Sequence, residues 1–300
     1  MNDRKKALID EQVKNLLDYY NSGQKNEAEE LALSITEKFP DNQFSWKVLG
    51  VLWLKNNEVS KAFYAMNKAI ELSPSDPSSL YNLGLALKEI GKLDEAEETY
   101  RKVIKLKNNY PEVHNNLGVV LNDSNNPDEA VGYLKKALTV NPNYPEAYNN
   151  LGNSFKQLDD LDQAVESYEK AITLNSSYID PYTNIAIVFT AKNENEKAEY
   201  YFKKALEISP ENIQNISTFA NHLYHQKLFD KSKELLFSII KMDPYHTESW
   251  NRLGLCHMEK ENYDAALSSF ERALTISPNQ IEPLNNKGLV FYKINSFIKA

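Results

Sequence analysis

Hydrophobic and small residues recur along this chain at a fixed spacing of 34 residues, with no insertion or deletion between copies. A glycine or alanine marks the first half of each copy, at Gly50, Gly84, Gly118, Gly152, Ala186, Ala220, Gly254 and Gly288. An alanine or serine marks the second half, at Ala28, Ala62, Ala96, Ala130, Ala164, Ala198, Ser232, Ala266 and Ala300. Spacing this regular predicts an architecture built from one repeated structural unit.

The apolar positions within each copy predict two helices. We number every copy from its first residue, with residues 145–178 as the reference. Positions 4, 7, 8 and 11 are apolar or small, which is the spacing of one face of a helix. Positions 20, 24 and 27, as in Ala164, Tyr168 and Ala171, form a second such stripe. The small residues at positions 8 and 20 leave no room for a large side chain. Each copy is therefore predicted to be a helix-turn-helix hairpin whose apolar faces are buried only when a neighbour stacks on it.

Prolines fall where such hairpins tolerate them. Pro77, Pro111 and Pro145 begin their repeats, and the first turn of a helix does not need the N–H that proline lacks. Pro127 falls where the second helix of its repeat is expected to begin. We expect none of these prolines to kink a helix.

The repeated residues resemble the tetratricopeptide repeat, whose pattern is W-x2-L-G-x2-Y, then A-x3-F, then P. One copy reads Trp250, Leu253, Gly254, Ala266, Phe270 and Pro278, with His257 in place of the tyrosine. Another reads Trp46, Leu49, Gly50, Trp53, Ala62 and Pro74. The resemblance implies an all-α solenoid of 34-residue helix-turn-helix repeats. It also implies a right-handed superhelix with the first helix of each repeat, helix A, on the inside.

We expect a single array over residues 1–300. Its repeats span 9–42, 43–76, 77–110, 111–144, 145–178, 179–212, 213–246 and 247–280, with a partial repeat at 281–300. Residues 1–8 are expected only to extend the first helix. The repeat at 213–246 is expected to be the weakest, because Ala220 and Ser232 replace the usual residues at positions 8 and 20.

The last repeat is expected to stop at Ala300, early in its second helix. Its helix A would then leave the apolar face around Leu284, Gly288 and Phe291 uncovered. We therefore expect self-association through this incomplete repeat, and we expect the chain to be a piece of something longer.

The composition limits which binding partners and which cellular compartment are expected. The chain has 34 Lys and Arg against 42 Asp and Glu, a formal net charge of −8, and no visible basic patch, which argues against nucleic acid. The single Cys256 allows no internal disulfide and suits a reducing compartment. No apolar run approaches the roughly 18 residues of a membrane span, and the first residues lack the hydrophobic region of a secretory signal. We expect a cytoplasmic protein with no membrane partner.

The residue pattern contains no catalytic constellation, so no enzyme activity, cofactor or metal is predicted. His222 and His225 lie three residues apart on one helix, but no further ligand has matching spacing, and a pair facing the groove is the favoured interpretation. Cys256, at position 10, and His114, at position 4, are interpreted as packing residues. No phosphate-binding glycine loop is present.

The resemblance implies that helix A positions 2, 5, 6, 9, 12 and 13 line an inner groove. The candidate peptide-binding residues are the position-6 asparagines Asn82, Asn116, Asn150, Asn184 and Asn286, together with Asn115, Asn149, Asn153, Lys88, Lys156, Leu85, Val119 and Ile187. Asparagine is a poor helix former, so a row of it inside helices needs a reason. Its amide can pair with both the N–H and the C=O of an extended peptide. The alternative is that asparagine at position 6 is only a habit of the family.

Two functional patterns of the family can be compared with these positions. In the chaperone-binding pattern, a clamp grips a terminal carboxylate. Lys47 and Asn82 fit this pattern, but Val51, Glu112 and Asn116 do not, so that clamp is absent. The unbroken run Asn82, Asn116, Asn150 and Asn184 is similar to the repeat arm of O-linked N-acetylglucosamine transferases. The leading hypothesis is a non-catalytic protein-interaction scaffold that binds an extended peptide. The alternative is the substrate-recognition arm of a glycosyltransferase or sulfotransferase whose catalytic domain follows residue 300.

Overall fold

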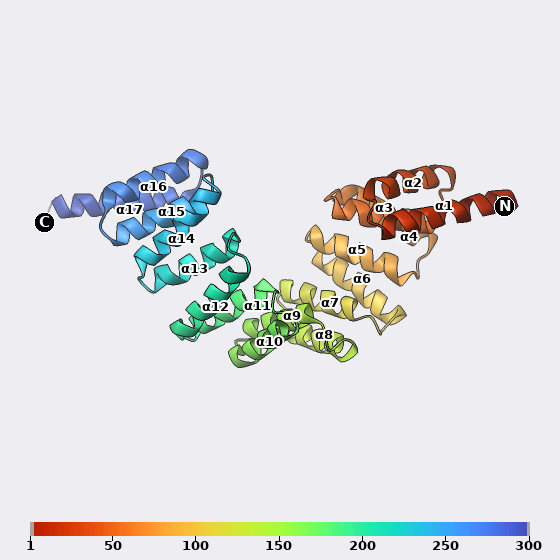
Figure 1. The fold of residues 1–300 in the computed structure, drawn as a ribbon, viewed down its shortest axis with the longest axis horizontal. Helices are drawn as coiled ribbons and strands as arrows, with labels where there is room; N and C mark the ends of the chain where they lie inside the picture. Colours follow the sequence, from red (N-terminus) through yellow and green to blue (C-terminus); the bar gives the residue numbers. More distant parts are fainter. Residues whose placement is uncertain (1–2, 299–300) are drawn as a thin grey trace. The chain divides into compact units, whose positions relative to one another are not determined.

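The structure, a computed structural model, describes residues 3–298, with side chains from residue 7 to residue 294. These residues form seventeen α-helices and no strand (Figure 1). The helices are α1 (Asp3–Asn21), α2 (Lys25–Lys38), α3 (Gln43–Lys55), α4 (Val59–Leu72), α5 (Pro77–Glu89), α6 (Leu93–Leu106), α7 (Pro111–Asp123), α8 (Pro127–Val140), α9 (Pro145–Gln157), α10 (Leu161–Leu174), α11 (Ile179–Ala191), α12 (Asn195–Ile208), α13 (Ile213–His225), α14 (Phe229–Met242), α15 (Thr247–Glu259), α16 (Tyr263–Ile276) and α17 (Ile281–Ile298). The predicted all-α repeat fold is confirmed.

The chain forms two compact units, and the boundary between Ser167 and Tyr168 lies inside α10. Odd-numbered helices are the A helices and even-numbered helices are the B helices. From α1 to α8 in unit 1 and from α11 to α16 in unit 2, each A helix packs on the B helix that follows it, and each of these B helices packs on the next A helix of its unit. In unit 1, consecutive A helices also contact one another, α3 with α5, α5 with α7 and α7 with α9. These A helices therefore form one continuous surface in unit 1.

Glycine at position 8 lies directly beneath the side chain at position 24 of its own repeat. A Cβ added to Gly84 would come within 2.4 Å of the Tyr100 ring, and one added to Gly118 within 2.6 Å of Leu134 Cγ. Position 20 is equally enclosed, because its alanines and Ser232 are fully buried in every described repeat. The predicted close approach of the two helices is confirmed at these positions.

The fifteenth residue of each full repeat lies in the turn from the A helix to the B helix, and its backbone is in the left-handed region. These residues are Gly23, Asn57, Gly91, Asn125, Asp159, Asn193, Lys227 and Glu261. After α3, the Asn57 N–H donates to the Leu54 carbonyl at 3.0 Å and the Glu58 N–H donates to the Trp53 carbonyl at 2.8 Å. This pair of bonds is the Schellman motif, which satisfies carbonyls at the end of a helix and reverses the chain.

The helix starts agree with the proline pattern. Pro77, Pro111 and Pro145 are the first residues of α5, α7 and α9, and Pro127 is the first residue of α8. The first helix begins at Asp3, so the residues before the first repeat do extend it.

The prediction of a second helix beginning before Ala300 is wrong for the described residues. The other A helices from α3 to α15 have 13 residues, whereas α17 continues unbroken for 18 residues, from Ile281 to Ile298. A Cβ added to Gly288 would meet nothing within 4 Å, so no B helix covers this face. Without that packing, nothing favours a turn over continued helical hydrogen bonding. Ala300 itself lies outside the described residues.

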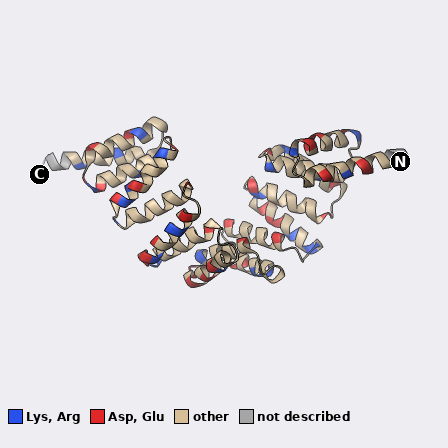
Figure 2. Cartoon of the chain, viewed as in Figure 1, with Lys and Arg blue, Asp and Glu red and all other residues tan. Residues whose placement is uncertain are grey.

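Charged residues are distributed along both units. Figure 2 shows acidic and basic residues interspersed on the helices, and several ion pairs join residues three or four apart within one helix. None of the helices within residues 3–298 is long and apolar enough to cross a membrane.

Candidate functional site

The A helices of unit 1 bring most of the predicted groove residues onto one surface. Position 6 is half-buried in α5, α7 and α9, where it is Asn82, Asn116 and Asn150. Leu85 and Val119, at position 9, are half-buried beside them. We call this set, together with Asn153, Lys88 and Lys156, the A-helix surface of unit 1.

Three amides at position 6 donate to position 5 of the preceding repeat. The Asn116 Nδ2 donates to the Tyr81 hydroxyl at 3.0 Å. The Asn150 Nδ2 donates to Asn115 Oδ1 at 2.9 Å. The same bond recurs in unit 2, where the Asn286 Nδ2 donates to Asn251 Oδ1 at 3.0 Å. These bonds orient the amides and link one repeat to the next.

The side chains at position 5 lie beneath the row of position-6 amides. Asn115 and Asn149 are each only 5% exposed, so most of their surface is out of reach of a ligand. The half-buried position-6 amides keep more binding capacity. An amide nitrogen carries two N–H groups, and one of them is used within the protein. Within the described part of the chain, the side-chain oxygens of Asn150 and Asn286 accept no hydrogen bond. An extended peptide could therefore pair with the oxygen and the second N–H.

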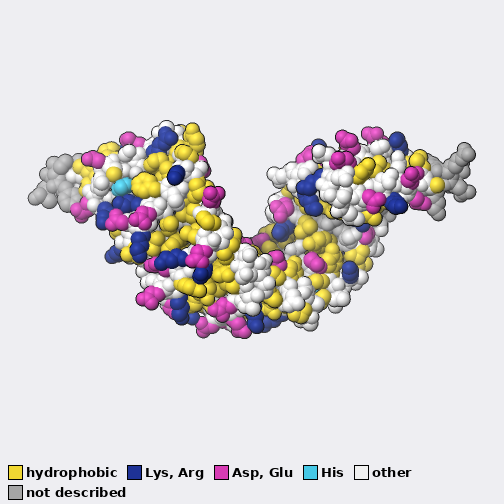
Figure 3. Space-filling model, viewed as in Figure 1, with side chains coloured by type: hydrophobic (Ala, Val, Ile, Leu, Met, Phe, Trp, Pro, Cys, Tyr) yellow, Lys and Arg dark blue, Asp and Glu magenta, His cyan; other side chains and the backbone are white. Residues whose placement is uncertain are grey.

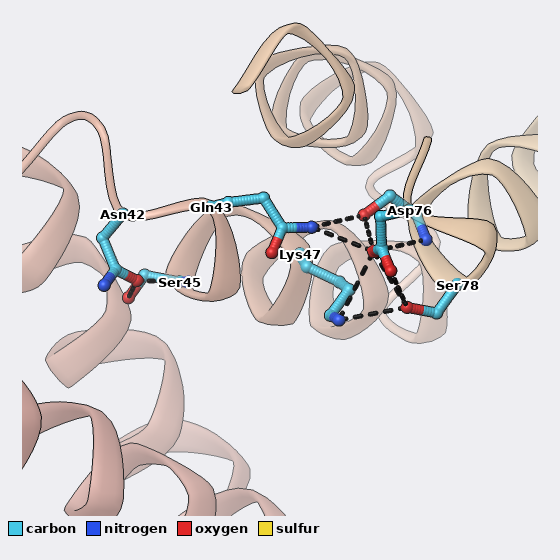
Figure 4. Close-up of polar contacts among 7 residues, drawn as sticks. Asn42, Gln43, Ser45, Lys47, Asp76 and Ser78 are labelled. Carbon is cyan, nitrogen blue, oxygen red and sulfur yellow. Dashed lines mark hydrogen bonds and ion pairs between the residues drawn. The ribbon is translucent and has the colours of Figure 1, made fainter. Parts of the chain in front are cut away.

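Asn82 lacks the link because position 5 of the preceding repeat is Lys47, a cation that can only donate. Lys47 is instead held by Asp76, with Nζ 3.5 Å from Oδ2, and by the Ser78 hydroxyl at 3.0 Å (Figure 4). Gln43 also donates to Asp76 Oδ2 at 2.9 Å. Burial of the Asp76 carboxyl is outweighed by hydrogen bonds from the Ser79 and Ser78 hydroxyls, the charge of Lys47 and the Ser79 N–H, so its pKa falls to about 2. Lys47 is thus occupied within the protein, which agrees with the absence of a carboxylate clamp here.

The two predicted lysines lie in different electrostatic surroundings. Lys88 Nζ is 3.8 Å from Glu89 Oε1, and its charge partly offsets the burial that raises the pKa of Asp123. Lys156 is half-buried, and burial lowers the pKa of its ammonium group. A ligand that offered Lys156 an acceptor would compensate for this burial.

In unit 2, position 6 is not always asparagine, and its side chains make different contacts from those in unit 1. The Thr218 hydroxyl donates to the Gln214 carbonyl of its own helix at 2.8 Å. Arg252 donates to Asn221 Oδ1 and lies 3.4 Å from Glu248 Oε1. Asn184 is half-buried, and Ile187 is 36% exposed. A hollow of about 550 Å³ lies beside Arg252 and is lined by Glu248, Asn251, Arg252, Asn279, Gln280, Ile281 and Glu282.

The histidine prediction was wrong in one respect. His222 is only 3% exposed, and its Nδ1 lies 2.8 Å from the Thr190 hydroxyl oxygen of the preceding A helix. Position 10 faces the neighbouring repeat, so His222 is a core residue, whereas His225 is exposed. No three His, Cys, Asp or Glu side chains among the described residues are grouped to hold a metal.

Cys256 and His114 are packing residues, as predicted. Cys256 is fully buried, its Sγ lies 3.7 Å from Ser232 Oγ, and burial raises the pKa of its thiol. His114 is 2% exposed, stacks on Tyr133 and has its Nε2 2.8 Å from the Asn108 carbonyl oxygen.

Stacked helical hairpins with an accessible row of A helices define the class of helical-repeat scaffolds, which bind other proteins. Models of the tetratricopeptide repeat match residues 14–77, 65–98, 86–125, 111–144, 145–178, 179–212 and 247–280. The chain belongs to the tetratricopeptide repeat family.

Two curated relatives match parts of the chain. A TPR repeat-containing protein of Methanocaldococcus jannaschii is 31% identical over 83 residues, which is 28% of this chain and 15% of that protein. The photosystem I assembly protein Ycf3 of Synechococcus is 32% identical over 66 residues, 22% of this chain and 38% of that protein. The matched segments thus span well under half the length of either relative. Among solved structures, MamA is 27% identical with a TM-score of 0.50, covering 55% of this chain and 97% of that one.

Proposed function

We propose that this chain binds an extended peptide, or an extended segment of a partner protein, along its A helices. The observation that carries the proposal is the row of position-6 amides, in which Asn116 and Asn150 are oriented by bonds to the preceding repeat and keep a second N–H for a ligand. Amides spaced along a row suit a peptide backbone, which repeats its own N–H and C=O groups. The name of one relative, an assembly protein, supports a role in holding other proteins.

The hydrogen bonds and apolar contacts of this surface can supply the binding free energy of a micromolar complex. A hydrogen bond between an amide and a peptide backbone contributes about 0.5–1.5 kcal/mol net, so Asn82, Asn116, Asn150 and Asn184 together could supply about 2–6 kcal/mol. A micromolar complex requires about 8 kcal/mol. Apolar contacts with Leu85, Val119 and Ile187 would supply the remainder. Binding should depend weakly on peptide sequence and only modestly on salt, because neutral amide pairs are little screened.

The test is a titration of the four-residue variant in which Asn82, Asn116, Asn150 and Asn184 are all alanine. The ligand would be a peptide selected from a displayed random library on the native chain. We expect binding to weaken at least about tenfold, while helix stability is kept or raised, because alanine is the better helix former. The control replaces Asn26, Asn109 and Asn143, which are exposed in α2 and in the loops before α7 and α9. Unchanged affinity in the four-residue variant would leave asparagine at position 6 as a family habit.

A substrate-recognition arm of a larger transferase would use the same surface. The run of asparagines that resembles such an arm supports this alternative. The residues that follow position 300 distinguish the two, because a nucleotide-sugar or sulfate-donor fold there would favour the enzyme. A reducing compartment such as the cytoplasm is proposed on the single buried cysteine.

We also propose self-association through α17. Ile281 is 73% exposed, Leu284 50% and Phe291 48%, and the space over Gly288 is open. Exposed apolar faces of this kind often mark association sites. Sedimentation should therefore show a concentration-dependent dimer that Phe291→Ser weakens. A monomer at every concentration would contradict this.

A further inference from the structure

The residue just before an A helix caps that helix in some repeats of unit 1 and not in others. Asn42 accepts a hydrogen bond from the Ser45 N–H at 2.9 Å, and Asp76 accepts one from the Ser79 N–H at 3.0 Å. Tyr110 before α7 and Tyr144 before α9 make no such bond. Tyrosine is not a capping residue, so these two repeats give up a stabilising contact. Their tyrosines therefore need another role.

Tyr110 packs on Tyr81 of α5, and Tyr144 holds the position of Tyr110 in the next repeat. The Tyr81 and Tyr110 ring centroids are 5.3 Å apart. Burial, Tyr81 and the charge of Glu112 together raise the pKa of Tyr110 to about 12. Burial first, and Glu112 among the other causes, also raises the pKa values of Tyr81 and Tyr144. Glu112 lies in the first turn of α7, two residues after Tyr110.

Two carboxylates beside these rings are not engaged within the protein. Glu112 and Glu146 are exposed in the first turns of α7 and α9, and neither has an ion-pair or hydrogen-bond partner in the described part of the chain. Asp76, by contrast, is held by Gln43, Lys47 and serine donors. Figure 3 shows carboxylates beside hydrophobic side chains, tyrosine included, on the visible face of unit 1.

We propose that Tyr81, Tyr110, Tyr144, Glu112 and Glu146, the tyrosine–carboxylate surface, bind the cationic side chain of a lysine or arginine in an extended peptide. Aromatic ring faces attract cations, and the carboxylates complement their charge. Lys107 Nζ lies 4.6 Å from the Tyr110 centroid, so one ring of this surface already contacts a cation of the chain itself. A net charge of −8 also favours a basic partner.

The surface is continuous with the amide row. The Tyr81 hydroxyl accepts the hydrogen bond that orients Asn116. A peptide backbone paired with Asn116 therefore passes beside Tyr81, and its side chains can reach the rings and carboxylates. This inference rests on the proposed function, because the cation is brought to the surface by a peptide held along the same helices.

The test compares two short fluorescent peptides of serine, glycine and alanine, one with a central lysine and one with acetyl-lysine in its place. Both are titrated against the whole chain by fluorescence anisotropy. Acetylation removes the charge, so we expect the acetylated peptide to bind about fivefold or more weakly. We expect Glu112→Gln combined with Glu146→Gln to remove most of this difference. Glu30→Gln combined with Glu37→Gln makes the same change at two exposed positions of α2, a B helix of unit 1, and we expect it to have no effect.

Two variants of Tyr110 test whether the aromatic rings contribute to cation binding. Tyr110→Phe keeps a ring and should retain the preference for lysine, whereas Tyr110→Leu should reduce it, with thermal melting confirming that both variants fold. Equal binding of the two peptides to the native chain would overturn the cation site and leave the peptide-binding proposal standing. A loss of preference in the α2 control would place the cation elsewhere and also overturn it. If neither peptide binds, both proposals fail.

Discussion

At the scale of single residues, the glycines at position 8 are explained by what lies above them. The side chain at position 24 occupies the space that a Cβ would need at Gly50, Gly84, Gly118 and Gly254. The opposing groups differ, from Met66 and Leu134 to the rings of Tyr100 and Phe270. Larger partners at position 24 are therefore accommodated by the same small residue at position 8.

Replacing Gly118 by leucine should destabilise the chain by about 1–3 kcal/mol, because the new side chain would overlap Leu134 in a fully packed site. Urea unfolding measures the change. Gly288→Leu is the matched control, since it makes the same substitution at position 8 where nothing lies within 4 Å. An equal cost at both sites would show that the close approach is not the cause.

The buried histidines predict a loss of stability in mild acid. Burial lowers the pKa values of His114, His222 and His257 below the ordinary value of 6.5. Just below that value the unfolded chain binds more protons than the folded one, so stability is full above pH 6.5 and declines as the pH falls below it. The contribution of Asp76, whose pKa is about 2, is lost only in a separate window below its ordinary 3.8.

Urea unfolding at about pH 7.5 and about pH 5 should show this decline, because histidine titrates between these values. His114→Phe should make the decline shallower, since one buried titrating group is removed. A stability that rises between these two pH values on acidification would contradict the assignment.

At the scale of helices, side-chain bonds between successive A helices add to the apolar contacts of the hairpins. Asn150 bonds to Asn115, and Asn116 bonds to Tyr81, across 35 residues in each case. In both pairs the donor is at position 6 and the acceptor at position 5 of the preceding repeat. The amide row therefore has a structural role in joining repeats as well as the binding role proposed for it.

A double-mutant cycle of Asn115→Ala and Asn150→Ala should show a coupling free energy of about 0.5–1.5 kcal/mol in favour of the native pair, the net value of one such bond. Equilibrium unfolding of the four proteins gives the coupling. Asn82 and Asn150 lie two repeats apart without a shared bond, so their changes should add within about 0.5 kcal/mol. Additivity in the first pair would mean that the bond contributes nothing measurable.

At the scale of the whole molecule, the repeats differ in how well they are supported by neighbours. The interior repeats are covered on both sides, whereas α17 exposes Ile281, Leu284, Phe291 and Tyr292. In the repeat at 213–246, Ser232 is fully buried at position 20, and its hydroxyl donates to the Ala220 carbonyl at 2.8 Å. A polar group there is satisfied, but it contributes less apolar packing than a hydrocarbon side chain.

Amide hydrogen exchange should therefore be fastest from about residue 213 to residue 300 and slowest from 77 to 178, since local opening requires less free energy where packing is poorer. Exchange followed by mass spectrometry resolves these segments. Ser232→Ala should slow exchange in 213–246, because it restores the residue found at position 20 elsewhere. Uniform protection along the chain would contradict the expected gradient.

The sequence by itself determined the all-α class, the register of the hairpins and the sites of close helix contact. These follow from local chemistry, because a helix repeats its apolar face every few residues and a close approach requires a small residue. The sequence pattern placed Pro111 in the first turn of α7 and Ala96 at a buried position of α6. The same local pattern cannot specify contacts between residues 35 positions apart.

Only the tertiary structure decided how the polar residues are used. The pairing of Asn150 with Asn115, the burial of His222 against Thr190 and the bond from Asn116 to Tyr81 all join different repeats. α17 likewise continues past the expected turn because no B helix packs over Gly288. A repeat sequence states which residues lie on a helix face, but the stacking of neighbours decides which of them are buried, bonded or left for a partner.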